Sequence, residues 1–135
     1  MEAKYESAIK VVRTSADAIY TRLSNFKNFG NVFPPDKISN WSATEDTCRF
    51  TVDKIGEIGL RIVDRIVNNT VKYGADGDSR FDFNLWVQMK EVAPYDSRIK
   101  VTLKANLNPM IKMMVGSKLQ TFVDGLADAI SRYQY

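Results

Sequence analysis

Hydrophobic residues recur every three or four positions through the last part of the sequence, from residue 109 to residue 135. The apolar positions are Ile111, Val115, Leu119, Phe122, Leu126, Ile130 and Tyr133. This spacing follows the 3.6-residue period of an α-helix and places these side chains on one face. A helix of roughly 25 residues is about 38 Å long, enough to lie across a small sheet. We therefore predict one long amphipathic helix that begins at Asn108 and Pro109.

Before this helix, apolar and polar residues alternate in several short runs, a pattern typical of β-strands. A first strand is predicted over residues 4–13, with room for a bulge near its end. A helix follows, for which Ser15 is a suitable N-cap, and a second short helix or turn comes before Pro34 and Pro35. Six further strands are predicted over residues 38–44, 47–53, 58–63, 71–75, 81–90 and 99–107.

The short turns between these strands decide how the sheet is connected. Parallel neighbours need crossovers of a dozen or more residues, so consecutive strands joined by turns indicate an antiparallel meander. Each clear strand has one apolar and one polar face, so one face of the sheet needs a cover. The long helix is the element that can supply it. We expect an α+β fold with a single domain over residues 1–135.

Composition narrows the function without naming it. Hydrophobic residues make up 44% of the chain and charged residues 26%, and the net charge is +3. Lys and Arg are spread along the sequence, so we expect no nucleic-acid partner. Cys48 is the only cysteine, which rules out an internal disulfide. The sequence shows no secretory signal and no apolar run long enough to span a membrane, so we expect a cytoplasmic protein.

The sequence contains no histidine. This removes the commonest general base, the commonest metal ligand and the histidine-activated nucleophiles. With a single cysteine as well, the composition argues against a zinc site. We predict no metal and no cofactor, and we assign no catalytic residue.

The order of elements carries a resemblance to a known family. The opening IKVVRTSADAIYTRLSNF, a strand that runs into a helix, and the closing NPMIKMMVGSKLQTFVDGLADAI resemble the START-like helix-grip superfamily. That group includes polyketide cyclases, lipid-transfer domains and plant pollen-allergen proteins, and the closing segment is similar to its small bacterial members. The resemblance covers nearly the whole chain. It implies a strongly curved seven-stranded antiparallel sheet around the last helix, with a cavity between them for an apolar small molecule.

The candidate cavity residues are the apolar side chains expected to face one another across this space. From the strands they are Phe50, Leu60, Ile62, Phe81, Phe83, Leu85, Val101 and Leu103. From the helix they are Met114, Val115, Leu119, Phe122 and Leu126. For any single one of them a place in a close-packed core is the favoured interpretation, and for the group the resemblance implies that some line a cavity, since pockets are mostly apolar too. Met110, Met113 and Phe33 are candidates for the entrance, or for filling gaps at the rim of the sheet.

Polar candidates are few. Asp64 continues the face of Leu60 and Ile62, where a carboxylate needs a partner. A bulge that turns it outward, an ion pair with Arg49 and a polar anchor in the cavity are the three alternatives. Asn40 and Tyr73 are similar, weaker candidates for orienting a ligand.

Three functions follow from these residues. The leading hypothesis is non-catalytic binding of a hydrophobic or amphipathic small molecule, such as a lipid, between helix and sheet. The alternative is a polyketide-cyclase-like enzyme in which Asp64, Tyr73 or Arg49 transfers protons, although no acid–base set stands out. A third is a protein-interaction module that uses the outer face of the sheet, where Trp86 and Arg61 fall on polar positions.

Overall fold

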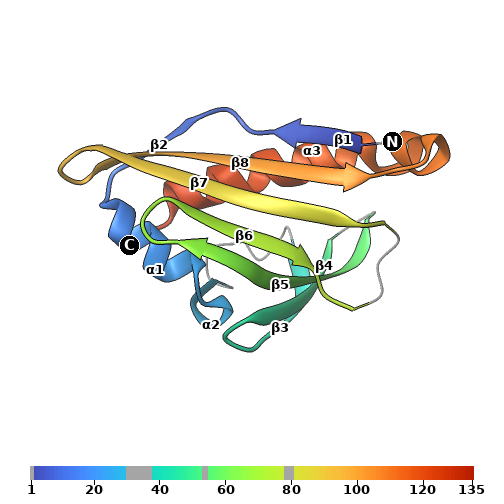
Figure 1. The fold of residues 1–135 in the computed structure, drawn as a ribbon, viewed down its shortest axis with the longest axis horizontal. Helices are drawn as coiled ribbons and strands as arrows, with labels where there is room; N and C mark the ends of the chain where they lie inside the picture. Colours follow the sequence, from blue (N-terminus) through green and yellow to red (C-terminus); the bar gives the residue numbers. More distant parts are fainter. Residues whose placement is uncertain (1, 30–37, 53–54, 78–80) are drawn as a thin grey trace.

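The computed structural model describes residues 2–29, 38–52, 55–77 and 81–135 (Figure 1). The chain begins with strands β1 (Glu2–Glu6) and β2 (Lys10–Val12) and helices α1 (Ala16–Leu23) and α2 (Phe26–Phe29). Six strands follow: β3 (Ile38–Ala43), β4 (Thr47–Val52), β5 (Gly56–Ile66), β6 (Thr70–Ala75), β7 (Phe83–Ala93) and β8 (Asp96–Asn106). Helix α3 (Pro109–Arg132) comes last. This order confirms the α+β arrangement predicted from the sequence.

The sheet has eight strands rather than the predicted seven, because the first strand is broken. Both pieces, β1 and β2, pair with β8. Between them, Ser7 exchanges two hydrogen bonds with Val101. The Ser7 N–H donates to the Val101 carbonyl at 2.9 Å, and the Val101 N–H donates to the Ser7 hydroxyl at 2.9 Å. A side-chain oxygen thus replaces a ladder carbonyl, and pairing resumes at Lys10.

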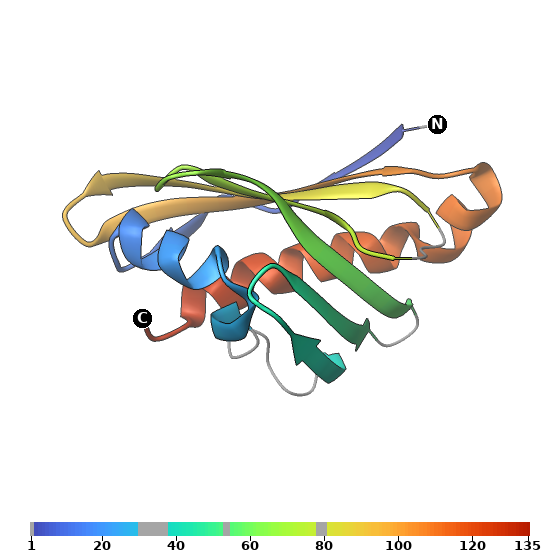
Figure 2. The same cartoon turned by 60° about the horizontal axis from the view of Figure 1, so that its bottom comes forward.

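The strands form one antiparallel sheet in the order β1-β8-β7-β6-β5-β4-β3, with β2 beside β8. The sheet is curved and does not close. Helix α3 lies across its concave face, while α1 and α2 cover the end of that face near β6 (Figures 1 and 2). A register shift between Ile62 and Asp64 marks a bulge in β5, which adds local twist.

Helix α3 starts at the predicted position and ends three residues earlier than predicted. The Asn108 side chain accepts a hydrogen bond from the Ile111 N–H at 2.8 Å and so caps the first turn. The helix ends at Arg132. Its buried residues are Val115, Leu119, Val123, Leu126, Ala127, Ala129 and Ile130. The predicted apolar face is therefore the face that packs against the sheet.

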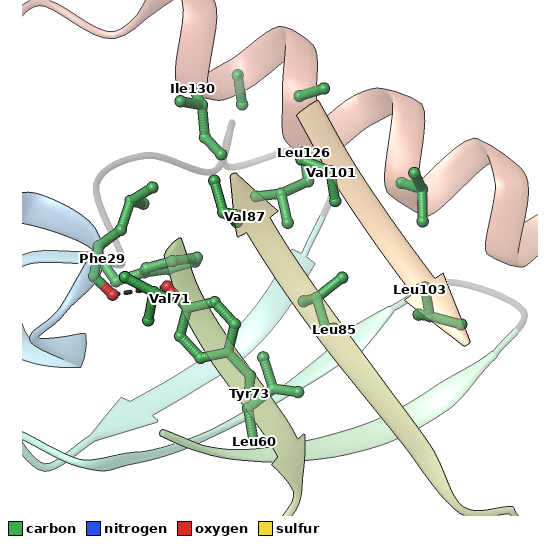
Figure 3. Packing of buried hydrophobic residues seen from close by; sticks show 14 of the residues in the cluster. Phe29, Leu60, Val71, Tyr73, Leu85, Val87, Val101, Leu103, Leu126 and Ile130 are labelled. Carbon is green, nitrogen blue, oxygen red and sulfur yellow. Dashed lines mark hydrogen bonds between the residues drawn. The ribbon is translucent and has the colours of Figure 1, made fainter. Parts of the chain in front are cut away.

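The core fills most of the space between α3 and the sheet. Figure 3 shows Leu85, Val101 and Leu103 on two neighbouring strands and Leu126 on the helix, all of them members of the core cluster. Tyr73 is fully buried on β6, and its hydroxyl donates to the Leu23 carbonyl at 2.6 Å, which ties the end of α1 to the sheet. Such interiors are close-packed, so an opening within this one needs a local cause.

Candidate ligand pocket

A pocket of about 110 Å³ remains between the middle of α3 and the concave face of the sheet. Six of its lining residues were among the predicted cavity residues: Leu60, Phe81, Phe83, Leu103, Leu119 and Phe122. Five further lining residues form the turn before β5 and the start of that strand: Ile55, Gly56, Glu57, Ile58 and Gly59. Eight of these lining residues are apolar, and the others are Gly56, Glu57 and Gly59.

Two glycines shape this edge of the pocket. Gly56 has φ +107°, a backbone conformation that residues with a side chain rarely adopt, so it sets the turn into β5. At Gly59, an added Cβ would overlap the carbonyl oxygen of Asp76. The missing side chain lets the Asp76 N–H donate to the Gly59 carbonyl at 2.9 Å. The sequence identified this segment only as a turn, because a glycine spacing alone does not say what packs beside it.

Arg49 stabilises this edge of the pocket through hydrogen bonds on the other face of the sheet. Its Nη1 donates to Glu57 Oε1 at 2.8 Å, and its Nη2 donates to the Asp76 carbonyl at 3.2 Å. One guanidinium therefore joins β4, β5 and the end of β6. Both charged side chains remain substantially solvent-exposed, so the ion pair itself contributes little stability. Its effect is to fix the position of Glu57, the one ionisable residue among the lining residues that the structure describes.

Phenylalanine rings form much of the pocket wall. Phe81 and Phe83 lie with their ring centroids 5.8 Å apart, and Phe122 stacks on Phe50 at 6.2 Å. Behind Phe50, the stack continues to Trp41 at 5.7 Å. Phe81, Phe83 and Phe122 are only half-buried. Part of each of these three rings is therefore exposed to solvent.

The remaining predicted cavity residues do not line the pocket. Phe50, Ile62, Tyr73, Leu85, Val101, Val115 and Leu126 are buried in the core cluster. Met114 was expected to face the cavity but is 55% exposed, and Met110 and Met113 are 72% and 88% exposed on the first turns of α3. Helix α3 turns these three methionines away from the sheet, so they lie on its outer side. Phe33 lies outside the described residues.

The polar candidates are separated from one another. Asp64 is exposed beyond the bulge in β5, where its Oδ1 accepts a hydrogen bond from the Arg65 N–H at 2.9 Å. The Tyr73 hydroxyl already donates its hydrogen bond to the Leu23 carbonyl. Burial raises the pKa of Tyr73 well above the ordinary value for tyrosine. Asn40 is exposed on β3. Asp64, Tyr73 and Arg49 therefore do not form one acid–base site.

The described part of the chain offers neither a metal site nor a membrane-spanning helix. No group of three or more His, Cys, Asp or Glu residues is placed to hold a metal ion within it. Over the same residues, no helix is both long enough and apolar enough to cross a membrane.

Comparisons with known proteins place the fold. Neither a protein-family model nor a curated protein sequence matches the chain. Among solved structures, a START superfamily protein from Mycobacterium smegmatis matches with a TM-score of 0.67 and 16% identity, covering 96% of this chain and 94% of that chain. Truncated norcoclaurine synthase from Thalictrum flavum matches with a TM-score of 0.77 and 16% identity, covering 98% and 92%.

A second structure of norcoclaurine synthase, in complex with dopamine and hydroxybenzaldehyde, has a TM-score of 0.73 and 14% identity, covering 98% of this chain and 86% of that chain. Identities this low establish architecture and leave function open. The similarity extends over almost the full length of the chain, from β1 to α3. The chain therefore has the START-like helix-grip fold.

Proposed function

We propose that this protein binds a hydrophobic or amphipathic small molecule in the pocket between α3 and the sheet. The observation that carries the proposal is the apolar pocket itself, in which Leu103 from β8, Leu119 from α3 and the phenylalanine rings converge. Ligand sites are typically concave and mostly apolar, with a few polar groups at fixed positions. Here the polar groups come from the segment that holds Gly56, Glu57 and Gly59.

The size of the pocket limits the part of a ligand that enters it. A volume of about 110 Å³ is below the range of about 300–1,000 Å³ for drug-sized ligands. An apolar cavity of roughly 150 Å³ in another protein holds one benzene molecule. The pocket therefore suits one ring or a short branched chain, and the rest of an amphipathic ligand would extend past Glu57 into solvent. A larger ligand requires the half-buried rings of Phe81, Phe83 and Phe122 to turn aside.

The fold supports the same class of ligand. Norcoclaurine synthase, which shares this architecture, has been solved with dopamine and hydroxybenzaldehyde, both of which contain a single aromatic ring. We infer from the pocket's dimensions and aromatic wall that a ring of this size is the group bound here. No catalytic step is part of the proposal, because Asp64, Tyr73 and Arg49 do not form one acid–base site and none of them is a lining residue of the pocket.

Two identical substitutions on α3 provide a matched test. Leu119→Phe directs a ring into the pocket, whereas Leu126→Phe places the same ring two turns further along, in the filled core. We expect Leu119→Phe to retain the wild-type free energy of unfolding and to lose binding of toluene, a neutral one-ring probe. Leu126→Phe should lose about 1–3 kcal/mol through overpacking and still bind toluene when folded.

The measurements are urea unfolding for stability and NMR shifts of the Leu103 and Phe122 signals for toluene binding. Mass spectrometry of the protein purified from cells would identify any ligand it retains. Equal toluene affinities in the wild type and in Leu119→Phe would remove the pocket as the binding site. A stability loss in Leu119→Phe as large as that in Leu126→Phe would show that no ring-sized space exists.

A further inference from the structure

A second and larger hollow lies on the convex face of the sheet, opposite the pocket. It has a volume of about 390 Å³ and crosses β5, β6, β7 and β8. We call it the outer groove and define it by Arg61, Gly74, Asn84, Trp86 and Lys104. Its volume falls within the range of ligand sites, unlike that of the pocket beneath α3.

The register of the sheet shows why this groove exists. Arg61 pairs with Gly74, Gly74 with Asn84, and Asn84 with Lys104, so four neighbouring strands contribute one row across the sheet. Strands lie about 4.8 Å apart, so the two cationic residues at the ends of the row are separated by roughly 14 Å between Cα atoms. The centre of the row has no side chain at Gly74. A glycine inside a strand often marks a place where a ligand approaches the backbone closely.

Arg61 and Lys104 line the groove, and Lys72 lies beside it on β6. Lys72 and Lys104 reach towards the same Trp86 ring from the strands on either side, with Nζ 5.3 Å and 5.9 Å from its centroid. Among the described residues, neither these two lysines nor Arg61 has a carboxylate within ion-pair distance. The ammonium groups of Lys72 and Lys104 repel each other, and an anion bound beside Lys104 would reduce that repulsion.

We infer that the outer groove binds a small molecule that has one carboxylate or phosphate group on a flat apolar body. Lys104 and the planar fork of Arg61 would bind the anionic group, since guanidinium pairs well with both kinds of oxyanion. The flat body would extend from there along the groove, beside Val63 and the edge of the Trp86 ring.

The acidic end of the groove argues for a small ligand. Glu2 and Asp82 also line it, on either side of Asn106, one row beyond Lys104. A nucleic-acid strand or an acidic peptide that followed the groove would meet these two carboxylates. A compact ligand with a single anionic group would stop before reaching them. The cationic residues of the groove therefore favour an anionic ligand, and its acidic end excludes a long one.

The test uses NMR of the whole protein with four probes: phenyl phosphate, benzoate, inorganic phosphate and benzyl alcohol. Phenyl phosphate or benzoate should shift the amide signals of Gly74 and Asn84 and the indole N–H of Trp86, with saturation. The probe that binds with the higher affinity identifies the preferred anionic group. Inorganic phosphate and benzyl alcohol each lack one half of the ligand and should bind at least about tenfold more weakly, a loss of the size that removing one good interaction causes.

Matched variants assign the effect to the groove. Lys104→Gln and Arg61→Gln should each weaken phenyl phosphate roughly two- to fivefold, the range expected for an exposed ion pair. Lys90→Gln removes the same charge from β7 outside the groove and should change nothing. Gly74→Ala adds a Cβ about 3.3 Å from Val63 Cγ1, within the hollow. This variant should also weaken the binding of phenyl phosphate. Its thermal unfolding curve shows whether it is still folded.

Three results would overturn the inference. The first is equal loss of affinity in Lys90→Gln and Lys104→Gln, which would indicate general attraction to a basic protein. The second is a set of shifts confined to Leu119 and Phe122, which would place the probe in the pocket under α3. The third is tighter binding of a ten-nucleotide oligothymidine than of phenyl phosphate, with strong salt dependence, which would assign the groove to a polyanion.

Discussion

Tyr73 shows how one polar atom is accommodated in an apolar core. Its ring packs against Phe26 and Phe29, with centroids 5.3 Å and 5.9 Å away, and its hydroxyl donates to Leu23. A buried hydroxyl is costly when left unpaired, so this hydrogen bond is what allows a tyrosine at the position. From the sequence, Tyr73 was a candidate for orienting a ligand. In the structure it fixes α1 against β6.

Cys48 should make stability depend on pH in the alkaline range. Burial raises the pKa of its thiol from about 9 to about 12. In the unfolded chain the thiol loses its proton above pH 9, while the folded protein keeps it. The stability that the neutral buried thiol contributes is therefore complete below pH 9 and is lost as the pH rises towards 12. The slope is at most about 1.4 kcal/mol per pH unit.

The variant that checks this is Cys48→Ala, compared with the wild type by urea unfolding at pH 8 and pH 10.5 under reducing conditions. We expect the wild type to lose more stability than the variant between the two values. Ionisation of the tyrosines affects both proteins and cancels in the comparison. Identical losses in the two proteins would show that the thiol is not the group responsible.

Helix α3 contains two glycines that differ in their surroundings. A Cβ added at Gly125 would meet nothing within 4 Å, whereas one at Gly116 would lie 3.1 Å from the Tyr5 hydroxyl oxygen. Glycine costs a helix interior about 1 kcal/mol relative to alanine. Gly125→Ala should therefore gain about 0.5–1 kcal/mol, and Gly116→Ala should gain clearly less or lose stability. Thermal unfolding of both variants measures the difference.

The comparison at Gly116 also reports on how closely α3 approaches β1. The Tyr5 hydroxyl is buried there, and it has no hydrogen-bond partner among the described residues. A Cβ at position 116 would be in tight contact with this hydroxyl, so the tyrosine would have to shift by a few tenths of an ångström. If Gly116→Ala gained as much stability as Gly125→Ala, this close approach would not be present in solution.

The whole molecule should unfold in a single transition, since α3 and the sheet share one core. The two tryptophans report on different places: Trp41 stacks between Phe29 and Phe50, while Trp86 lies on the convex face. We expect helix loss by circular dichroism and the fluorescence changes of both tryptophans to coincide in urea. Single-tryptophan variants separate the two signals. Transitions that differ by probe would divide the chain into more than one folding unit.

The architecture could be predicted from the sequence because periodicity directly reflects which face of an element is buried. The turns, the N-caps at Ser15 and Asn108 and the apolar face of α3 all follow from local rules. Asp64 could not be placed, because a bulge one residue earlier reverses the direction of every following side chain.

The pocket was only partly predictable for a different reason. Alternation identifies which side chains face inward, but it does not say where they leave space. Leu85 and Leu103 look alike in the sequence, yet only Leu103 borders the opening. The opening depends on Gly56 and Gly59, which bring a turn and the Asp76 backbone into contact across strands. Such contacts depend on three-dimensional proximity.

The position of α3 in the chain has a consequence for biosynthesis. All the strands of the sheet are translated before the 24-residue helix that covers their apolar face. At about 5–20 residues per second, a ribosome needs roughly one to five seconds to add this helix. During that time the apolar face of the sheet in the nascent chain is exposed to solvent. Chaperones bind surfaces of this kind, and aggregation begins at them. Packing of α3 against the sheet completes the core and ends this exposure.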